Sequence, residues 1–317
     1  MQLKGNIEDA DILIRQKSLL SSLFLEKNIK KYMFWYYTPM ALLIGDELSP
    51  DLIIYDCMDE LANFRFAPSG LKELESRLIA RSDLVFTGGK SLYNKKKDQN
   101  DSVYCFPSSI DKEHFSRAQN FNEGPSDQKN IPHPRLGYFG VLDERLDTIL
   151  IKEIASKRPE WHFIYIGPVA KIDPSSLPKD KNIHYLGCKD YKILPDYLAG
   201  WDIALMPFII NETTEFISPT KTPEYLAAHK PVISTPVTDV VNPYGENGLV
   251  NVASTADEFI AAAEKELTAE NEEWKVNVDN FLANISWEIT FQQMHDLIKQ
   301  KLAGTTKIKN ADEFIQQ

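Results

Sequence analysis

The chain has 317 residues, of which 43% are hydrophobic and 26% charged, a composition typical of soluble globular proteins. Its formal net charge of −11 argues against nonspecific nucleic-acid binding, which requires a positive surface. It contains neither an apolar run of the roughly 18 residues that span a bilayer nor a signal-peptide core near Met1, and its three scattered cysteines do not suggest a disulfide framework. We therefore predict a cytoplasmic protein with room for two domains.

In the first part of the chain, short apolar runs alternate with helical patterns, which favours a parallel sheet covered by helices. The clearest helix is expected over 71–81, where apolar residues recur every three or four positions and Glu73 precedes Arg77 by four. Strands are expected at 11–15, 32–37, 52–55, 84–87 and 103–106. We predict an N-terminal domain over 1–116.

Residues 117–134 lose this periodicity and are rich in polar residues, Gly and Pro, so they are predicted to be an interdomain linker. The alternation then restarts, predicting a second doubly wound domain over 135–284. Its strands are expected at 136–140, 162–167, 183–186, 203–206, 232–234 and 249–252, and its helices near 146–157, 191–199, 221–228 and 255–267. A terminal helix near 287–302, within a crossover segment 285–303, precedes a loose tail at 304–317.

The most informative segment is EFISPTKTPEYLAAHKPVIST at 215–235. Ser218 and Pro219 suit a helix start, where free amides and the helix dipole favour an anion such as a phosphate. Lys221 adds a positive charge there. Glu224 projects from nearly the same face and could accept hydrogen bonds from two ribose hydroxyls. The alternative is an exposed ion pair between Lys221 and Glu224, which stabilises a helix by only about 0.2–0.5 kcal/mol.

A second segment, GYFGVLDERLD at 137–147, predicts a strand, a glycine turn and a helix start. Gly140 allows the backbone to approach a ligand closely, and Arg145 is expected near the helix entrance, within reach of a diphosphate. The alternative is a tight turn in which Arg145 pairs with Asp143 or Asp147.

These two segments, with WHFIYIGPV (161–169), NIHYLGCKDYKILPDYLAGWDIALMPF (182–208) and ISWEITFQQM (285–294), follow the order found in GT-B glycosyltransferases. The chain resembles the family 4-like enzymes of bacterial surface-polysaccharide synthesis. YDCMDEL (55–61), LVFTGGKSLY (84–93) and FPSSIDKEHF (106–115) extend the resemblance upstream. It implies two Rossmann-like doubly wound domains facing a cleft, with the donor held by the C-terminal domain.

The resemblance implies a role for each candidate residue. Lys221 and Arg145 would contact the diphosphate and assist catalysis, and Glu224 would hold the ribose. Further donor-binding residues would be Gly140, Tyr185, Ser218 and Thr220, with Cys188 as an alternative to Tyr185 beside the base. Two weaker catalytic candidates are Glu215, beside the donor sugar, and Asp59, which could orient an acceptor hydroxyl or equally well cap a helix. No metal ligands and no cofactor are expected.

The chain also departs from the family. Residues 1–10 offer neither the usual first strand nor its glycine-rich loop, so the N-terminal domain is expected to be abbreviated. We predict a retaining glycosyltransferase that moves a sugar from a nucleotide diphosphate-sugar to a saccharide or lipid-linked acceptor. Two alternatives stay open: an inactive nucleotide-sugar-binding component of a polysaccharide-assembly complex, and a nucleotide-sugar epimerase.

Lys27, Lys30 and Lys31 precede an aromatic stretch at 33–37, a combination that suits anionic lipid headgroups. Peripheral contact with the inner face of the membrane is therefore a further hypothesis. A solvated helix end is the alternative.

Overall fold

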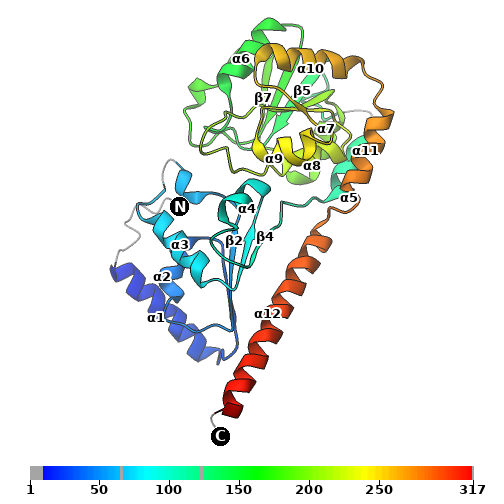
Figure 1. Cartoon of the computed structure of the whole chain (residues 1–317). Coiled ribbons are helices and arrows are strands. Elements are labelled where there is room, and N and C mark those ends of the chain that lie inside the picture. The colour runs from blue at the N-terminus through cyan, green and yellow to red at the C-terminus, as the bar shows by residue number, and fades with distance from the viewer. Residues whose placement is uncertain (1–9, 65–66, 121–123, 316–317) are drawn as a thin grey trace. The chain divides into compact units, whose positions relative to one another are not determined.

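The computed structural model describes residues 10–64, 67–120 and 124–315, with side chains up to Gly304. It divides the chain into two compact units, one formed by Met1–Pro107 with Thr290–Gln317 and the other by Ser108–Ile289. Each unit is built on its own parallel sheet (Figure 1). The sequence pattern placed the boundary later, with a linker at 117–134. The prediction that residues 1–9 contain no strand lies outside the described residues.

The first unit has a four-stranded sheet in the order β1-β2-β3-β4. All three strand pairs are parallel. Because the strand order follows the sequence, the chain progresses across the sheet in one direction. The elements of this unit are α1 (Ala10–Glu26), β1 (Met33–Tyr36), α2 (Leu42–Gly45), β2 (Leu52–Cys57), α3 (Leu71–Arg81), β3 (Leu84–Thr87), α4 (Lys90–Lys96), β4 (Val103–Cys105) and most of α12 (Trp287–Ile315).

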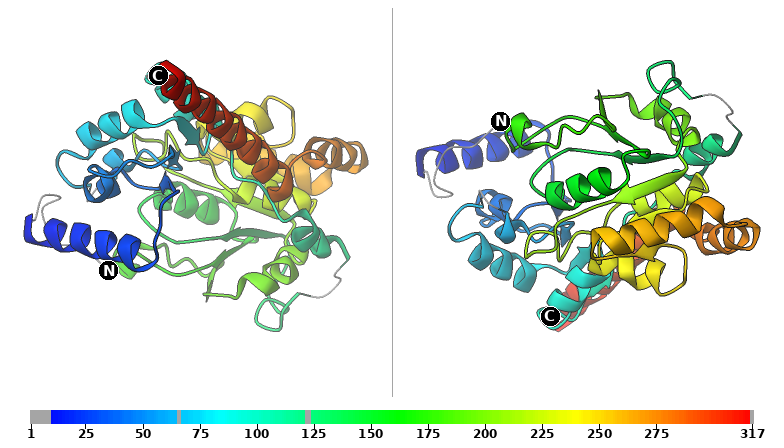
Figure 2. Two further views of the ribbon diagram at one scale, coloured as in Figure 1. Left: turned by 90° about the horizontal axis from the view of Figure 1, so that it is seen from below. Right: turned by 90° about the horizontal axis from the view of Figure 1, so that it is seen from above.

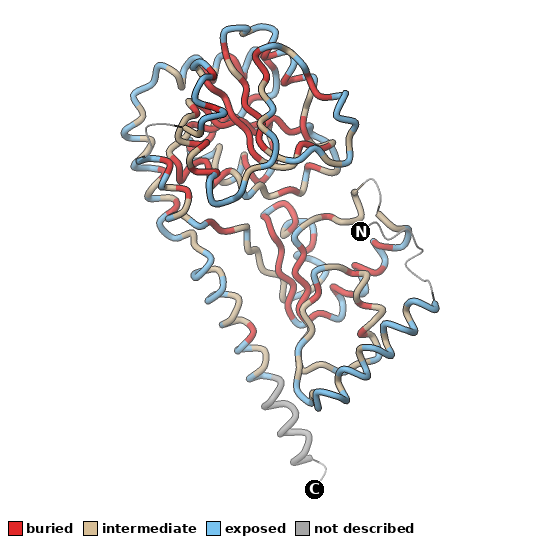
Figure 3. Tube along the Cα trace, turned by 180° about the vertical axis from the view of Figure 1, so that it is seen from behind, coloured by how far each residue is buried: buried red, intermediate tan, exposed pale blue. Residues whose placement is uncertain are grey.

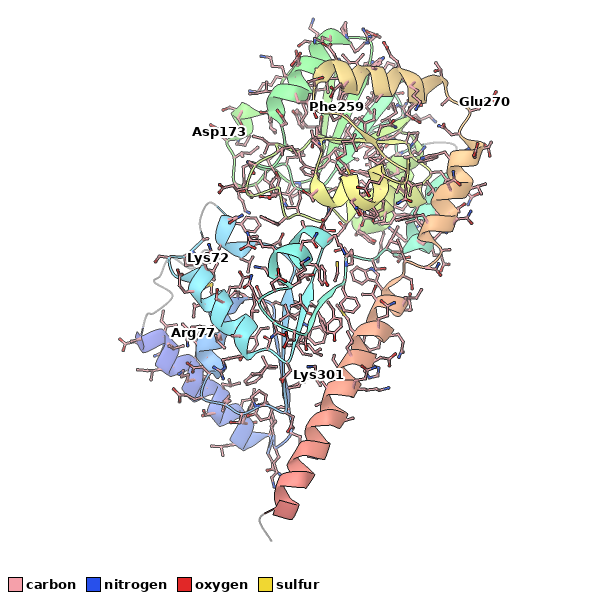
Figure 4. All side chains as sticks on the ribbon, in the orientation of Figure 1. Lys72, Arg77, Asp173, Phe259, Glu270 and Lys301 are labelled. Carbon is pink, nitrogen blue, oxygen red and sulfur yellow. The ribbon has the colours of Figure 1, made fainter. Side chains whose placement is uncertain are left out.

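The last helix, α12, returns the chain to the first unit, where it is the long red helix of Figures 1 and 2. Ile298, which is buried, joins a cluster with strand residues such as Ile54 and Phe86. Lys301, labelled in Figure 4, donates a hydrogen bond from Nζ to Oγ of Ser102 at 2.8 Å. The helix continues past the predicted end at residue 302 to Ile315, through most of the predicted loose tail.

The expected strand at 11–15 is wrong, because these residues belong to helix α1. A five-residue apolar run cannot be distinguished from part of a helix by periodicity alone. Over the longer segment, the partly buried side chains of Leu13, Lys17, Leu20 and Phe24 recur at helical spacing. No residue of α1 is fully buried, and Figure 3 shows this helix mostly in pale blue beside the red strands of its unit.

The second unit has a six-stranded parallel sheet in the order β10-β9-β8-β5-β6-β7. Numbered within the unit, this is the strand order of the Rossmann fold. Its elements are α5 (Lys112–Ser116), β5 (Arg135–Phe139), α6 (Thr148–Lys157), β6 (His162–Ile166), β7 (Ile183–Gly187), α7 (Leu194–Ala199), β8 (Ile203–Met206), α8 (Lys221–Ala227), β9 (Val232–Ser234), α9 (Thr238–Val240), β10 (Asn251–Val252), α10 (Ala256–Thr268) and α11 (Glu272–Leu282).

The central strands β5 and β8 are buried at every residue, because helices cover both faces of a parallel sheet. Helices α6 and α10 pack against each other on the outside of this unit. Part of the predicted linker also belongs to its interior. Gln128 is fully buried, accepts a hydrogen bond from Nε1 of Trp201 at 2.9 Å and donates one to the Tyr197 carbonyl at 2.9 Å.

Candidate donor site at the carboxyl end of β5

The sheet of the second unit opens at the carboxyl end of β5. On one side β5 pairs with β6 as far as Phe139 and Ile166, whereas its pairing with β8 ends at Gly137 and Ala204. The strand order also reverses between β5 and β8. Ligands of open α/β sheets bind beyond the strand ends at such a reversal, so this edge is where a donor site is expected.

Two glycines bring the backbone together at this edge. Gly140 follows β5 with φ +143° and donates from its N–H to the Ile166 carbonyl at 2.8 Å. Gly167 follows β6 with φ +144°, and a Cβ atom there would overlap the carbonyl oxygen of Gly140. A Cβ atom on Gly140 would in turn overlap Cε of Lys221 and lie 3.0 Å from its Nζ. Glycine at 140 is therefore what lets Lys221 reach the strand end.

Helix α8 is fixed to β5 by Tyr225. The Phe139 N–H, which points into the gap between the strands, donates to the Tyr225 hydroxyl at 3.0 Å. The two rings also meet edge to face, with centroids 4.9 Å apart. Tyr225 is fully buried, so this hydrogen bond holds α8 rigidly against the strand. The positions of Lys221 and Glu224 on the same helix follow from it.

Lys221 and Glu224 are both half-buried. Within the described parts of the chain, the structure gives neither side chain a hydrogen bond or an ion pair, so the predicted alternative of a mutual ion pair is not formed. The ammonium of Lys221 lies 5.7 Å from the centroid of the Tyr138 ring. Burial lowers the pKa of Lys221, and burial raises the pKa of Glu224. A cation and a carboxylate without strong partners are thus held beside the strand ends.

Arg145 adds a second cation to this region, because its charge contributes to the lowered pKa of Lys221. Its guanidinium binds the buried carboxylate of Asp143 through two nitrogens, with Nε 2.9 Å from Oδ1 and Nη2 2.7 Å from Oδ2. The pairing with Asp143 that the sequence left open is therefore present. Asp147 instead caps α6, accepting the Leu150 N–H at 2.9 Å.

The other donor-site candidates lie in two places. Ser218, half-buried, and Thr220, exposed, immediately precede α8, and Glu215 is exposed in the turn before them. Tyr185 projects from β7 onto the Tyr165 ring, with centroids 5.6 Å apart, and its hydroxyl donates to the Pro178 carbonyl at 2.9 Å. Burial raises the pKa of Tyr185 to about 12.

Asp59 and the two carboxylates closest to it in the sequence, Asp56 and Glu60, belong to the first unit. Asp56 is buried and accepts from Nε1 of Trp35 at 3.0 Å. Glu60 is also buried and pairs with Nζ of Lys96 at 2.9 Å. Asp59 is half-buried, and its acceptor role stays a prediction.

Two contacts of the site escaped the sequence analysis. The Tyr225 hydroxyl and the Tyr138 ring define where α8 and Lys221 lie. In the sequence, however, Tyr138 resembles an ordinary core residue of a strand, and Tyr225 an ordinary core residue of a helix. The available signal is chemical, because a buried tyrosine hydroxyl requires a partner. That signal does not identify the partner in the sequence.

In the described ranges, the structure contains no group of three or more His, Cys, Asp or Glu side chains that could hold a metal ion.

The chain is similar to known glycosyltransferases. Residues 133–269 match the family model described as glycosyl transferases group 1. The chain is 28% identical over 290 residues to TuaH of Bacillus subtilis (strain 168), named as a candidate teichuronic acid biosynthesis glycosyltransferase, covering 84% of this chain and 72% of TuaH.

Solved structures share the fold at low sequence identity. Anabaena Alr3699/HepE in complex with UDP superposes with a TM-score of 0.70 at 12% identity, over 90% of this chain and 82% of HepE. A glycosyltransferase from Rickettsia africae ESF-5 superposes with a TM-score of 0.69 at 13% identity, over 95% of this chain and 84% of that protein. The chain therefore has the GT-B fold, carries a group 1 glycosyltransferase domain at residues 133–269, and is a glycosyltransferase.

Proposed function

We propose that the chain transfers a sugar from a nucleotide diphosphate-sugar to a saccharide or lipid-linked acceptor in bacterial cell-surface polysaccharide synthesis. The observation that carries this proposal is the placement of Lys221 against Gly140, with Glu224 one turn further along α8. Both residues are half-buried at the strand reversal, where a nucleotide would bind. The relation to TuaH supports the polysaccharide pathway, and the UDP complex of HepE supports a nucleotide donor.

In this proposal the two cations stabilise the departing nucleoside diphosphate. Negative charge grows on the diphosphate as the sugar–phosphate bond breaks, and Lys221 and Arg145 are already held beside the strand end before the donor arrives. A preorganised cation in a site that excludes water lowers the barrier more than the same charge does in water. Glu224 accepts hydrogen bonds from the ribose hydroxyls, which anchors the donor without taking part in bond cleavage.

We further propose that the reaction is retaining and needs neither metal nor cofactor. A thermal-shift screen of the full chain against UDP-, GDP- and dTDP-sugars identifies the donor, because a bound ligand stabilises the folded state by RT ln(1 + [L]/Kd). Release of the nucleoside diphosphate is then measured with saccharide and lipid-linked acceptors, with and without EDTA, and NMR of the product gives its anomeric configuration. Binding without release would favour the inactive donor-binding component, and conversion of the donor without acceptor would favour an epimerase.

We also propose that the first unit contacts the inner face of the membrane through α1. Among the residues that the structure describes, none of the helices has the length and apolar character needed to cross a bilayer. Helix α1 nevertheless exposes several large apolar side chains along its length. They are Ile12, Ile14, Leu19, Leu23 and Leu25.

Helical spacing puts Ile12, Leu19 and Leu23 in one stripe of α1. The exposed lysines 27, 30 and 31 follow directly after the helix. Apolar side chains beside a cluster of lysines suit the boundary between acyl chains and anionic headgroups.

A further inference from the structure

An exposed aromatic ring follows the carboxyl end of β7 in the second unit. Tyr191 lies four residues after Gly187, the last residue of that strand, and its side chain is 49% exposed. The ring is nevertheless well supported. His114 stacks on it with centroids 4.5 Å apart and planes 11° from parallel, and Phe115 meets it edge to face at 5.6 Å. These contacts fix the orientation of the Tyr191 ring and leave about half of the side chain accessible.

The supporting residues are themselves held in place. Nε2 of His114 lies 3.0 Å from the Tyr191 carbonyl oxygen, to which it donates, and the His114 backbone N–H donates to Oδ1 of Asp111 at 2.9 Å. Phe115 is fully buried and stacks on Phe139 of β5 with centroids 6.0 Å apart. The support therefore joins segments 77 residues apart in the sequence.

This ring lies in the neighbourhood of the donor-site carboxylate. Helix α5, which carries His114 and Phe115, packs against α8, and Phe139 contacts Tyr225, the residue after Glu224. Burial raises the pKa of Tyr191, and the negative charge of Glu224 raises it further. Strand β7 lies two positions from β5 in the sheet, or about 10 Å at the usual strand spacing.

We propose that Tyr191 is the ring on which the base of the donor nucleotide stacks, with His114 as the residue that positions it. The proposal rests on the function proposed above, since it places the base relative to Glu224 and Lys221. An aromatic face accepts any nucleobase, because every base has a π face. Tyr185, which the sequence suggested for this role, directs its ring at Tyr165 and its hydroxyl at Pro178.

Calorimetric titrations of the full-length chain test this assignment. The probes are UDP, GDP and dTDP, with inorganic pyrophosphate as the ligand that lacks a base. The variants are Tyr191→Ala, Tyr191→Phe, which keeps the ring, and His114→Ala. Tyr185→Ala, at the position in β7 that the sequence suggested for this role, tests the competing assignment. Unfolding temperatures of all variants establish that each one is folded.

Tyr191→Ala is expected to weaken the preferred nucleoside diphosphate roughly ten-fold or more, the usual effect of losing one stacked aromatic, while pyrophosphate binds as before. Tyr191→Phe and Tyr185→Ala should keep nucleotide affinity, and His114→Ala should lose part of it. An unchanged nucleotide affinity in Tyr191→Ala, or an equal loss for nucleotide and pyrophosphate, would overturn the assignment. The assignment would also be overturned if the wild-type protein bound pyrophosphate as tightly as any nucleotide. If the wild type binds none of the four probes, the proposed function itself fails.

Discussion

The side chain of Lys221 occupies the space above Gly140, and any Cβ atom at position 140 would overlap its Cε. Gly140 belongs to the turn after β5 and Lys221 to the first turn of α8, so two separate segments form one surface at the strand reversal. The left-handed backbone at Gly140, with φ +143°, is part of the same arrangement.

Gly140→Ala should therefore abolish donor binding. The new methyl group would displace Lys221, and the left-handed backbone would cost about 1–3 kcal/mol of stability in addition. Gly248→Ala is the matched control, because Gly248 has φ +67° but nothing within 4 Å of its Cβ position. Both variants should lower the unfolding free energy, and only Gly140→Ala should lose donor affinity. Normal donor affinity in Gly140→Ala would contradict the placement of Lys221.

Lys221→Ala should lower the turnover number by about 10²–10³-fold, the usual effect of deleting one electrostatic contact to a developing charge. Because Lys221 is half-buried and makes no ion pair among the described residues, its removal should leave the unfolding temperature nearly unchanged. Lys181→Ala, at an exposed lysine of the same unit, serves as the control. Steady-state kinetics give the turnover numbers of both variants. Equal turnover numbers for Lys221→Ala and Lys181→Ala would exclude Lys221 from the reaction.

The first unit contains a buried charged cluster whose role we expect to be structural. Lys96 is 1% exposed and binds Glu60 at 2.9 Å and Glu75 at 2.7 Å. Lys96→Met would leave Glu75 buried without its cation and Glu60 with only Lys95, whose Nζ lies 3.4 Å from Oε2, at a cost of about 3–5 kcal/mol. The exposed Lys157, which pairs with Glu153 and Asp257, provides the comparison, and Lys157→Met should change stability little. Urea unfolding gives the free energy of unfolding of each variant. Similar unfolding midpoints for Lys96→Met and Lys157→Met would refute the structural role of the buried cluster.

A histidine pair should make the second unit sensitive to acid. Nδ1 of His162 lies 3.0 Å from Nε2 of His184 on the neighbouring strand. Burial lowers the pKa of both side chains. The positive charge of Arg135 lowers the pKa of His162 further, and the charge of protonated His162 lowers the pKa of His184 further. As pH falls through the unfolded value of about 6.5, the unfolded chain binds protons that the folded pair resists, so stability decreases.

Unfolding free energies measured at about pH 7.5 and about pH 5.5 test this linkage. The loss on acidification should shrink in His184→Gln, which keeps a polar side chain but removes the titrating group. His295→Gln, at a histidine of the first unit, should behave like the wild type. An identical acid loss in all three proteins would show that other groups are responsible.

Membrane contact through α1 is tested with vesicles that contain anionic lipid. Replacement of lysines 27, 30 and 31 by Gln should weaken vesicle binding on the order of a hundred-fold, since each lysine near an anionic surface contributes about 1 kcal/mol. The triple change Ile12→Ser, Leu19→Ser and Leu23→Ser should abolish binding, whereas Ile149→Ser, at a residue 79% exposed in the second unit, should not. Co-sedimentation gives the bound fraction. Wild-type protein that stays in the supernatant would refute the hypothesis.

Much of the fold could be predicted from the sequence, because the spacing of apolar residues indicates which residues of a helix or strand are buried. Helix α3 and strands β3, β8 and β9 were predicted with the bounds that the structure gives them. Helix α11 was missed, although its apolar residues Trp274, Val278, Phe281 and Leu282 recur at helical spacing. In the structure only Val278 and Leu282 of its eleven residues are fully buried. Helix α1 was misread from a window too short to reveal its helical spacing.

The site could be predicted only in part, because its geometry depends on contacts between distant segments. A motif shared with a family identified Lys221 and Glu224. It could not reveal that Tyr225 hydrogen-bonds to a backbone N–H 86 residues earlier in the chain, or that Lys221 fills the space above Gly140. These relationships arise from the divergence of β5 and β8, which no local pattern encodes.

The most direct test of the account is a thermal-shift titration of the wild type and of Glu224→Ala with UDP-, GDP- and dTDP-sugars. We predict that one nucleotide class raises the unfolding temperature of the wild type and that Glu224→Ala loses most of this shift, since the ribose hydroxyls lose their acceptor. An equal shift in both proteins would place the donor elsewhere on the molecule. No shift with any of the three would contradict a donor site at the carboxyl end of β5.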